Sequence, residues 1–303
     1  MGVLAIIAAL LLEQWRPLAE RKALSGVSAR YAVWLEERFN AGEARHGVIA
    51  WLVAVCPVVL GALILHLILY RAHPLLALAL NAAALYLTMG FRQFSHFFTG
   101  IQKALAAGDL ARARDLIGAW RGDMAEHLTR EEVVRLSIEE ALLASHRHVF
   151  AVLFWFVVLP GPSGALLYRL SVFLAHRWGG LGAFGAFAAR VLHWLEWPAT
   201  RLTAAAFAVV GDFEDAIYCW RTQAAGWPDR LSGIVLAAGA GAMGVRLGMP
   251  IADAAGGVAP RPELGLGEIA DAPFLDSTVG LLWRALVLWV LVLLVLAVVS
   301  ALR

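Results

Sequence analysis

Long apolar stretches are the feature of this sequence that most constrains its fold. A helix that crosses a bilayer needs about 20 consecutive apolar residues, and residues 48–70 meet that length without a charged side chain. Another apolar stretch, residues 75–90, follows after a short segment that ends in His73-Pro74. Because a proline disfavours helical conformation in the residue before it, we expect the two stretches to form a helical hairpin.

Further apolar stretches extend this pattern. Residues 149–159 and 165–175 flank a Pro- and Gly-rich break, residues 231–249 are rich in glycine, and residues 281–302 carry Trp283 and Trp289 near their start. Irregular backbone at membrane depth is tolerated only where protein or water covers it, and closely spaced glycines let helices approach each other. The first twelve residues lack the features of a cleavable signal peptide. We therefore predict five crossings and an N-terminal helix that dips into the membrane.

The composition agrees with this interpretation, because the chain is 61% hydrophobic and 16% charged, whereas soluble domains carry about 25% charge. Soluble, disordered and disulfide-rich secreted classes are therefore excluded. Cys56 and Cys219 give neither a disulfide framework nor a metal-binding spacing. The sequence predicts an all-α, polytopic helical integral membrane protein, with residues 1–303 as one membrane domain.

Basic residues predict how the chain is oriented. Residues 13–46 and 91–148 hold 14 of the 25 Lys and Arg, and short basic flanks stay in the cytoplasm. Residues 91–148 also show helical periodicity, with Thr129 and Glu132 spaced as a capping box. We expect this segment to be a cytoplasmic helical insert. Acids balance the basic residues in both stretches, so nucleic-acid binding is not expected.

Standard phosphate loops, nucleophile elbows and zinc signatures do not occur in the sequence, so catalytic residues stay unassigned and no metal site is predicted. Two polar clusters are candidate ligand-binding sites. Arg121 and Asp123 flank a glycine and could bind a phosphate and a metal, or form a polar turn between helices. Glu139, His146 and His148 precede an apolar stretch. They could transfer protons or hold a metal-bound phosphate, or they could anchor the helix at the lipid headgroups.

A third candidate region, residues 190–202, contains tryptophans around His193 and Glu196. This pattern fits an amphipathic helix in the membrane interface. Its arginines, Arg190 and Arg201, are further ligand-binding candidates, and we expect Arg201 to have an anionic partner.

Several segments occur in the order found in the CobD/CbiB family of membrane proteins, which the chain resembles from about residue 100 to residue 290. They are residues 109–114, 121–123, Glu139, 153–155, 168–169, 189–190, 198–202, 240–250 and 261–265. The resemblance implies a multi-pass protein of the bacterial inner membrane that acts in cobalamin biosynthesis. Family members use ATP and magnesium to join an aminopropanol group, often phosphorylated, to adenosylcobyric acid through an amide bond.

The sequence departs from the family pattern at several acidic or amide positions. Apolar or basic residues stand there instead, at 143–144, 147, 172–175 and 235–236. Residues 12–17, 192–197 and 282–286 resemble the related AmpE branch, which is described as modulating β-lactamase induction. We therefore expect a non-ligase modulator that binds an anionic small or lipid-linked ligand at the cytoplasmic membrane edge.

Two alternatives remain open. One is an adenosylcobinamide(-phosphate) synthase, which would use ATP and magnesium and bind a corrinoid. The other is a scaffold or transporter-like component, favoured by the glycine-rich stretch. The lipid bilayer is the expected environment in every case, and the sequence permits an oligomer.

Overall fold

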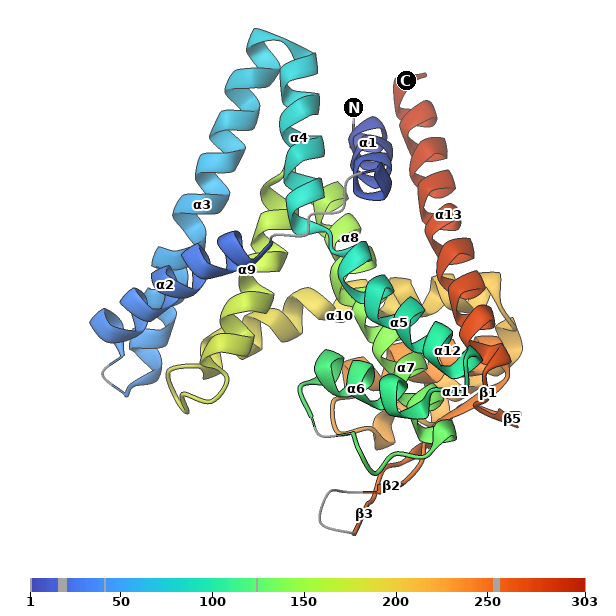
Figure 1. Ribbon diagram of the computed structural model, residues 1–303. Helices are drawn as coiled ribbons and strands as arrows, with labels where there is room; N and C mark the ends of the chain where they lie inside the picture. The colour runs from blue at the N-terminus through green and yellow to red at the C-terminus, as the bar shows by residue number, and fades with distance from the viewer. Residues whose placement is uncertain (1, 16–20, 41, 124, 253–256, 303) are drawn as a thin grey trace. The chain divides into compact units, whose positions relative to one another are not determined.

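The computed structural model describes residues 2–15, 21–40, 42–123, 125–252 and 257–302, and most of them are helical (Figure 1). The chain divides into two compact units. The first unit combines Met1–Gly90 with Ala151–Ala199, and the second combines Phe91–Phe150 with Thr200–Arg303. The predicted all-α class is confirmed, and five short strands are added to it within the described residues.

The first unit contains the predicted hairpin. Its helices are α1 (Gly2–Trp15), α2 (Arg21–Phe39), α3 (Ala44–Ala72), α4 (Pro74–Thr88), α8 (Ala151–Val158), α9 (Ser163–Trp178) and the start of α10 (Ala186–Val210). His73 separates α3 from α4: its backbone N–H donates to the Leu69 carbonyl at 2.8 Å, and its Nδ1 accepts from the Leu75 N–H at 3.2 Å. Thus one residue ends the first helix of the hairpin and caps the second.

The predicted Pro- and Gly-rich break between residues 149–159 and 165–175 is also confirmed. It lies between α8 and α9. Ser163 Oγ closes the turn by donating to the Pro160 carbonyl at 2.7 Å. A side chain at Gly164 would place a Cβ 1.8 Å from the Trp155 carbonyl oxygen. Only glycine therefore allows the two helices to pack this closely.

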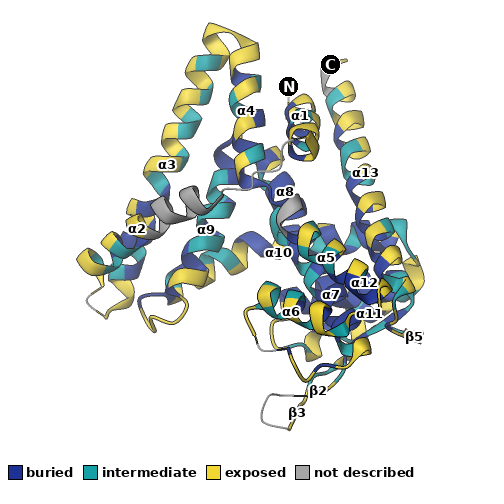
Figure 2. Cartoon of the chain, in the orientation of Figure 1, coloured by how far each residue is buried: buried dark blue, intermediate teal, exposed yellow. Residues whose placement is uncertain are grey.

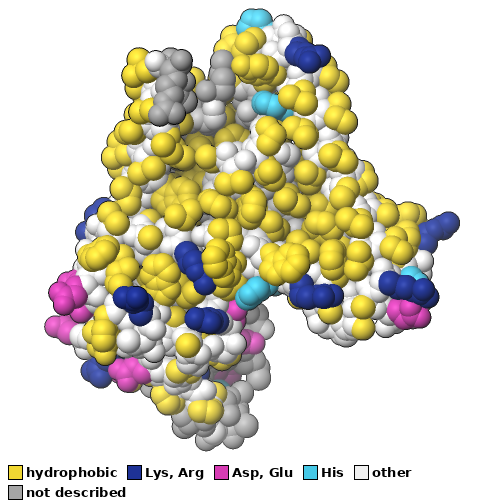
Figure 3. Space-filling model, turned by 180° about the vertical axis from the view of Figure 1, so that it is seen from behind, with side chains coloured by type: hydrophobic (Ala, Val, Ile, Leu, Met, Phe, Trp, Pro, Cys, Tyr) yellow, Lys and Arg dark blue, Asp and Glu magenta, His cyan; other side chains and the backbone are white. Residues whose placement is uncertain are grey.

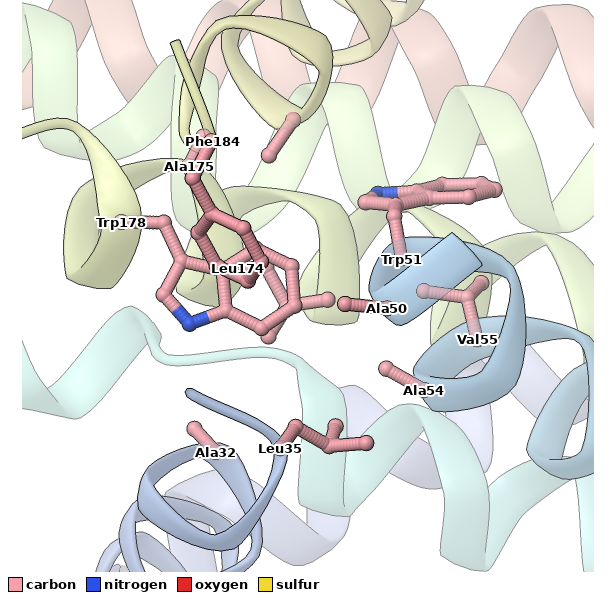
Figure 4. Close-up of a cluster of buried hydrophobic side chains, with 11 residues drawn as sticks. Ala32, Leu35, Ala50, Trp51, Ala54, Val55, Leu174, Ala175, Trp178 and Phe184 are labelled. Atoms are coloured by element: carbon pink, nitrogen blue, oxygen red, sulfur yellow. The ribbon is translucent and has the colours of Figure 1, made fainter. Parts of the chain in front are cut away.

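A buried aromatic core joins α2, α3 and α9 within the first unit (Figure 4). Trp178 and Phe184 are fully buried and pack edge to face, with their ring centroids 5.0 Å apart. The indole N–H of Trp178 donates to Glu36 Oε1 at 3.0 Å, and Arg177 Nε donates to the same oxygen at 3.0 Å. A buried indole normally has such a hydrogen-bond partner, so Glu36 anchors α2 to α9.

The second unit contains α5 (Phe91–Ala106), α6 (Leu110–Arg121), α7 (Arg130–Ser145), a π-helix (His146–Phe150), the end of α10, α11 (Phe213–Thr222), a 3-10 turn (Ala224–Gly226), α12 (Arg230–Met243) and α13 (Pro273–Ala301). The segment 91–148 is helical, as predicted. The capping box is confirmed as well: the Thr129 N–H donates to Glu132 Oε2 at 2.7 Å, and the Glu132 N–H donates to Thr129 Oγ1 at 3.2 Å.

The prediction that residues 231–249 form a membrane crossing is wrong. Helix α12 ends at Met243, Gly244 adopts φ +65°, and the strand β1 (Val245–Gly248) follows. Protein covers the helix on all sides, and α12 is dark blue in Figure 2. Its glycines allow close contacts, since a Cβ at Gly241 would lie 2.5 Å from the Asp215 carbonyl oxygen. The apolar composition of this stretch therefore serves a protein core.

Two small sheets follow α12. The strand β1 pairs antiparallel with β4 (Glu263–Leu264) and parallel with β5 (Glu268–Ile269), while β2 (Ile251–Ala252) pairs antiparallel with β3 (Val258–Ala259). In the first sheet Leu247 lies opposite Leu264, and both are fully buried. This sheet is held against α12 through β1 and β4.

Three helices are long and apolar enough to cross a membrane within the part of the chain that the structure describes, compared with the five crossings predicted. They are Ala44–Ala72, Arg130–Val158 and Pro273–Val299. In the first and third, only 22% of the most apolar window is buried by protein, and α3 and α13 are mostly yellow and teal in Figure 2. Hydrophobic side chains also dominate the face seen in Figure 3. A bilayer is the environment that covers such surfaces.

Candidate functional site

A buried carboxylate, Glu139, forms the centre of the candidate site in the second unit. Its side chain on α7 is almost fully enclosed, with a residue exposure of 2%. Glu139 Oε1 accepts from the Gly248 backbone N–H at 2.9 Å, and Oε2 accepts from the Arg261 guanidinium. A buried carboxylate with a partner for each oxygen is satisfied. Glu139 therefore joins α7 to a segment more than 100 residues later in the chain.

The backbone around Gly248 is held in an uncommon conformation. Gly248 has φ +71°, and the next residue, Met249, has φ +62°, a left-handed value that is rare for a residue with a side chain. The Met249 N–H donates to the Pro262 carbonyl at 3.2 Å. A Cβ at Gly248 would lie 2.0 Å from that carbonyl oxygen. Backbone strain of this kind is found most often at functional sites.

Two arginines lie beside Glu139. Arg135 precedes it by one turn of α7 and has an exposure of 6%; its Nη2 donates to the Pro250 carbonyl at 3.0 Å. The guanidinium of Arg261 lies over the Trp227 ring, 4.8 Å from the centroid. Arg135 Nε and Arg261 Nη1 are buried and have no hydrogen-bond partner among the described residues.

The predicted Arg121 and Asp123 cluster is an ion-pair network at the end of α6. Arg121 Nη1 lies 3.2 Å from Glu140 Oε1, and Arg121 Nη2 lies 3.7 Å from Asp123 Oδ2. Gly122 takes the left-handed conformation that ends α6, with φ +77°. Because Glu140 follows Glu139 directly, the fold brings the first and second predicted clusters together. Asp123 itself is largely exposed.

The structure places His146 and His148 in the π-helix that follows α7. His146 is buried, with its Nδ1 2.9 Å from Thr203 Oγ1 and its Nε2 3.3 Å from Thr200 Oγ1. Both ring nitrogens are therefore occupied by α10 hydroxyls, and the ring contacts these threonines rather than Glu139. His148 is half-buried.

The remaining candidates, Arg190 and Arg201, belong to different units of the chain. Arg190 is exposed, and its Nε donates to the Ala186 carbonyl one turn earlier at 3.3 Å. Arg201 is half-buried on the second half of α10. The tryptophans between them are exposed, Trp194 by 71% and Trp197 by 52%. Such exposure is typical of an aromatic face at a membrane interface.

An N-terminal cap on α12 contributes a further polar contact that the sequence analysis did not identify. Asp229 accepts from the N–H groups of Leu231 at 3.3 Å and Ser232 at 3.0 Å, and from Ser232 Oγ at 2.5 Å. Burial tends to raise the pKa of Asp229, but these hydrogen bonds outweigh it and the pKa is lowered. Arg147 Nη2 donates to the same Ser232 hydroxyl at 3.3 Å.

Sequence reasoning did not place Arg135 or Arg261 in a site with Glu139, although Arg261 belongs to the segment 261–265 that carries the family resemblance. One signal was present: Arg135 interrupts an apolar run between Val134 and Leu136, on a helix that otherwise buries this region. Gly248 and Pro250 belong to the segment 240–250 of the family resemblance, but neither they nor Trp227 carried a sign of contact with Glu139 or its arginines, because that contact depends on long-range packing.

Comparison with known proteins identifies the family. The model of the family described as CobD/Cbib protein matches residues 6–282. The chain belongs to the CobD/Cbib family. It is 37% identical over 299 residues to the cobalamin biosynthesis protein CobD of Stutzerimonas stutzeri (strain A1501), which covers 96% of each chain.

Other CobD/Cbib relatives carry the same name. The cobalamin biosynthesis protein CobD of Chromobacterium violaceum is 39% identical over 71% of this chain and 70% of its own length. That of Rhodobacter capsulatus is 29% identical over 82% of this chain and 77% of its own length. No solved structure matches the chain. The family resemblance is confirmed, whereas the names of these relatives lend no support to the expected role in β-lactamase regulation.

The residues of the site fit anionic groups better than a metal held by protein alone. No group of three His, Cys, Asp or Glu side chains that could hold a metal ion occurs among the residues for which a placement is described. Glu139 and Glu140 each pair with an arginine. Guanidinium groups suit phosphate and carboxylate oxygens, so the site can recognise anions, and no step through a metal follows from it.

Proposed function

We propose that this CobD/Cbib protein acts in cobalamin biosynthesis, as an adenosylcobinamide(-phosphate) synthase. The reaction would form an amide bond between the amino group of an aminopropanol, free or phosphorylated, and a carboxyl group of adenosylcobyric acid. One observation carries this proposal: the chain is 37% identical, over 96% of both lengths, to a protein named for cobalamin biosynthesis.

The second unit supplies chemistry that supports the proposal. Amide formation needs an activated carboxyl group, and ATP would supply the activating phosphoryl group when bound. Phosphoryl oxygens are recognised by guanidinium N–H donors. Arg135 is buried one turn before Glu139 on α7, and the partly buried Arg261 pairs with Glu139. Such preorganised donors stabilise charge that develops during a reaction.

We also propose that the protein works in the bacterial inner membrane, with residues 91–148 in the cytoplasm, where ATP is present. Reporter fusions test this placement. A phosphatase fused within residues 124–128 should stay inactive, and one fused after His73 should be active. Activity in the first fusion would place the insert outside.

Genetic complementation tests the function directly. The chain should restore growth of a strain that lacks this ligase and depends on cobalamin made from adenosylcobyric acid. Glu139→Gln should abolish growth, because it disrupts the candidate site. Arg177→Lys is the control, since Arg177 pairs with Glu36 in the first unit and should be dispensable.

A biochemical assay distinguishes the ligase from a non-catalytic binding protein. Purified protein, adenosylcobyric acid, the aminopropanol and ATP with magnesium should yield the amide product, detected by mass spectrometry. Absence of both growth and product, despite wild-type amounts of protein in the membrane, would refute the ligase and favour a modulator that only binds an anionic ligand.

A further inference from the structure

We propose that Arg135 and Arg261 bind a phosphoryl group through the guanidinium N–H groups that have no protein partner. The inference rests on the proposed function only for the source of that group, which is ATP or the phosphorylated amine. Its physical basis is a buried cation that lacks a counter-ion.

Three carboxylates near the site already have arginine partners. Glu139 pairs with Arg261, Glu140 with Arg121, and Glu263 with Arg246. Arg135 is the arginine of this region that forms no ion pair among the described residues. Its contact is a neutral carbonyl, that of Pro250.

The acids within electrostatic range of Arg135 are Glu131, Glu132 and Glu139. Glu131 is exposed at the start of α7, where water weakens its effect. Glu132 Oε2 accepts from the Thr129 N–H at 2.7 Å and so belongs to the helix cap. Both oxygens of Glu139 are occupied. None of the three neutralises Arg135 by direct contact.

A buried charge without a partner is costly, and proteins normally pair such charges or use them to bind ligands. With Arg261 inside the same electrostatic range, the two guanidinium groups and Glu139 carry one net positive charge. The buried Nε–H of Arg135 and Nη1–H of Arg261 are free donors. A phosphoryl oxyanion supplies both the missing charge and the missing acceptors.

The fold holds the two arginines in a closed ring of contacts. Arg135 bonds to Pro250, Met249 bonds to the Pro262 carbonyl, and Arg261 precedes Pro262 and bonds to Glu139. Glu139 in turn lies one helical turn from Arg135. Glu139 is thus a positioning residue, and Arg135 and Arg261 are the ligand-binding residues.

Calorimetric titration of the full-length protein in detergent tests the proposal, with inorganic pyrophosphate as the probe and ATP and the phosphorylated aminopropanol in separate arms. Arg261→Lys keeps the charge and the pairing with Glu139 but removes the free Nη1–H. We expect affinity for pyrophosphate to fall at least about tenfold, the effect of a lost charge-assisted hydrogen bond. The tighter of the two organic ligands identifies the source of the phosphoryl group.

Arg135→Met separates a binding role from a structural one. If Arg135 binds an anion, the variant loses saturable pyrophosphate binding. Its unfolding temperature without ligand then equals or exceeds that of the wild type, because a buried unpaired charge has been removed. If Arg135 only supports the fold, the variant misfolds or melts earlier, and the proposal is overturned. Arg177→Met is the control and should bind pyrophosphate as the wild type does.

Other outcomes also decide the proposal. Absence of saturable binding by the wild type, unchanged binding by Arg135→Met, or equal affinity for acetate would each overturn the phosphoryl assignment. These results are independent of complementation. If the protein supports growth but binds no pyrophosphate, the proposed function stands and the phosphoryl site is refuted. If it binds pyrophosphate but supports no growth, the site stands and the proposed function is refuted.

Discussion

Replacing Glu139 by glutamine removes one charge from the candidate site and leaves the size of the side chain nearly unchanged. The two carboxylate oxygens face two donors, the Gly248 N–H and the Arg261 guanidinium. A glutamine has one acceptor oxygen and one NH₂ group, so one of the donors must face another donor. No cavity forms, and the effect on stability is therefore electrostatic.

The magnitude follows from burial. Breaking a buried ion pair by removing one partner costs about 3–5 kcal/mol, because the remaining charge stays buried. Glu140→Gln is a matched control: it is the same substitution at the next position of α7, and it also removes an arginine partner. The pair between Glu140 and Arg121 is partly exposed, with side-chain exposures of 27% and 26%, and partly exposed pairs contribute about 0–1 kcal/mol.

Denaturant titration of both variants in detergent, followed by tryptophan fluorescence, measures the difference. We expect the free energy of unfolding to fall about 3 kcal/mol more for Glu139→Gln than for Glu140→Gln. A double variant that also carries Arg261→Met should recover part of this loss, because it removes the stranded charge. Equal destabilisation by the two single variants would show that Glu139 is not an enclosed partner of Arg261, and the site as described would be wrong.

Three further predictions concern the second unit. Gly248→Ala should destabilise by about 1–3 kcal/mol more than Gly244→Ala, since both have positive φ but only Gly248 faces the Pro262 carbonyl within 4 Å; chemical denaturation measures the difference. The pKa of Asp229 is lowered from 3.8, so its contribution to stability is present above pH 3.8 and is lost as the pH falls through the folded pKa. In an acid titration of the free energy of unfolding, Asp229→Asn should therefore lose less stability than the wild type over this pH range. Burial raises the pKa of Cys219 to about 11, so N-ethylmaleimide at pH 7 should label it only after denaturation, as peptide mass spectrometry can show.

The sequence was sufficient to predict features that depend on local chemistry. His73-Pro74 marks the turn of the hairpin because proline restricts the residue before it, and the structure ends α3 at Ala72. The capping box of α7 is similarly contained in four residues. The break near Gly164 follows from the proline and glycine content alone. In each case the decisive interactions lie within a few positions of one another.

The error at residues 231–249 has a different origin. A helix that faces lipid and one that is enclosed by protein both require apolar side chains, so composition does not separate α12 from α13. Burial separates them: the residues Leu231–Ala242 of α12 are buried, whereas α13 exposes large side chains such as Val295 at 61%. The packing of α12 against α7 and α11 therefore places it inside the protein. No residue pattern within 231–249 predicts that packing.

The site around Glu139 depends both on local sequence and on long-range packing. This explains why the sequence predicted Glu139 as a site residue but not the residues that it contacts. An acid that leads into an apolar helix is conspicuous in the sequence, but its partners at 248 and 261 are 109 and 122 residues away. With those partners in place, both oxygens of Glu139 are occupied, and it cannot bind a metal or a proton donor without releasing Arg261 or Gly248. Arg135 and Arg261 retain free donors. We therefore expect these arginines, rather than Glu139, to bind the ligand, while the carboxylate of Glu139 orients them.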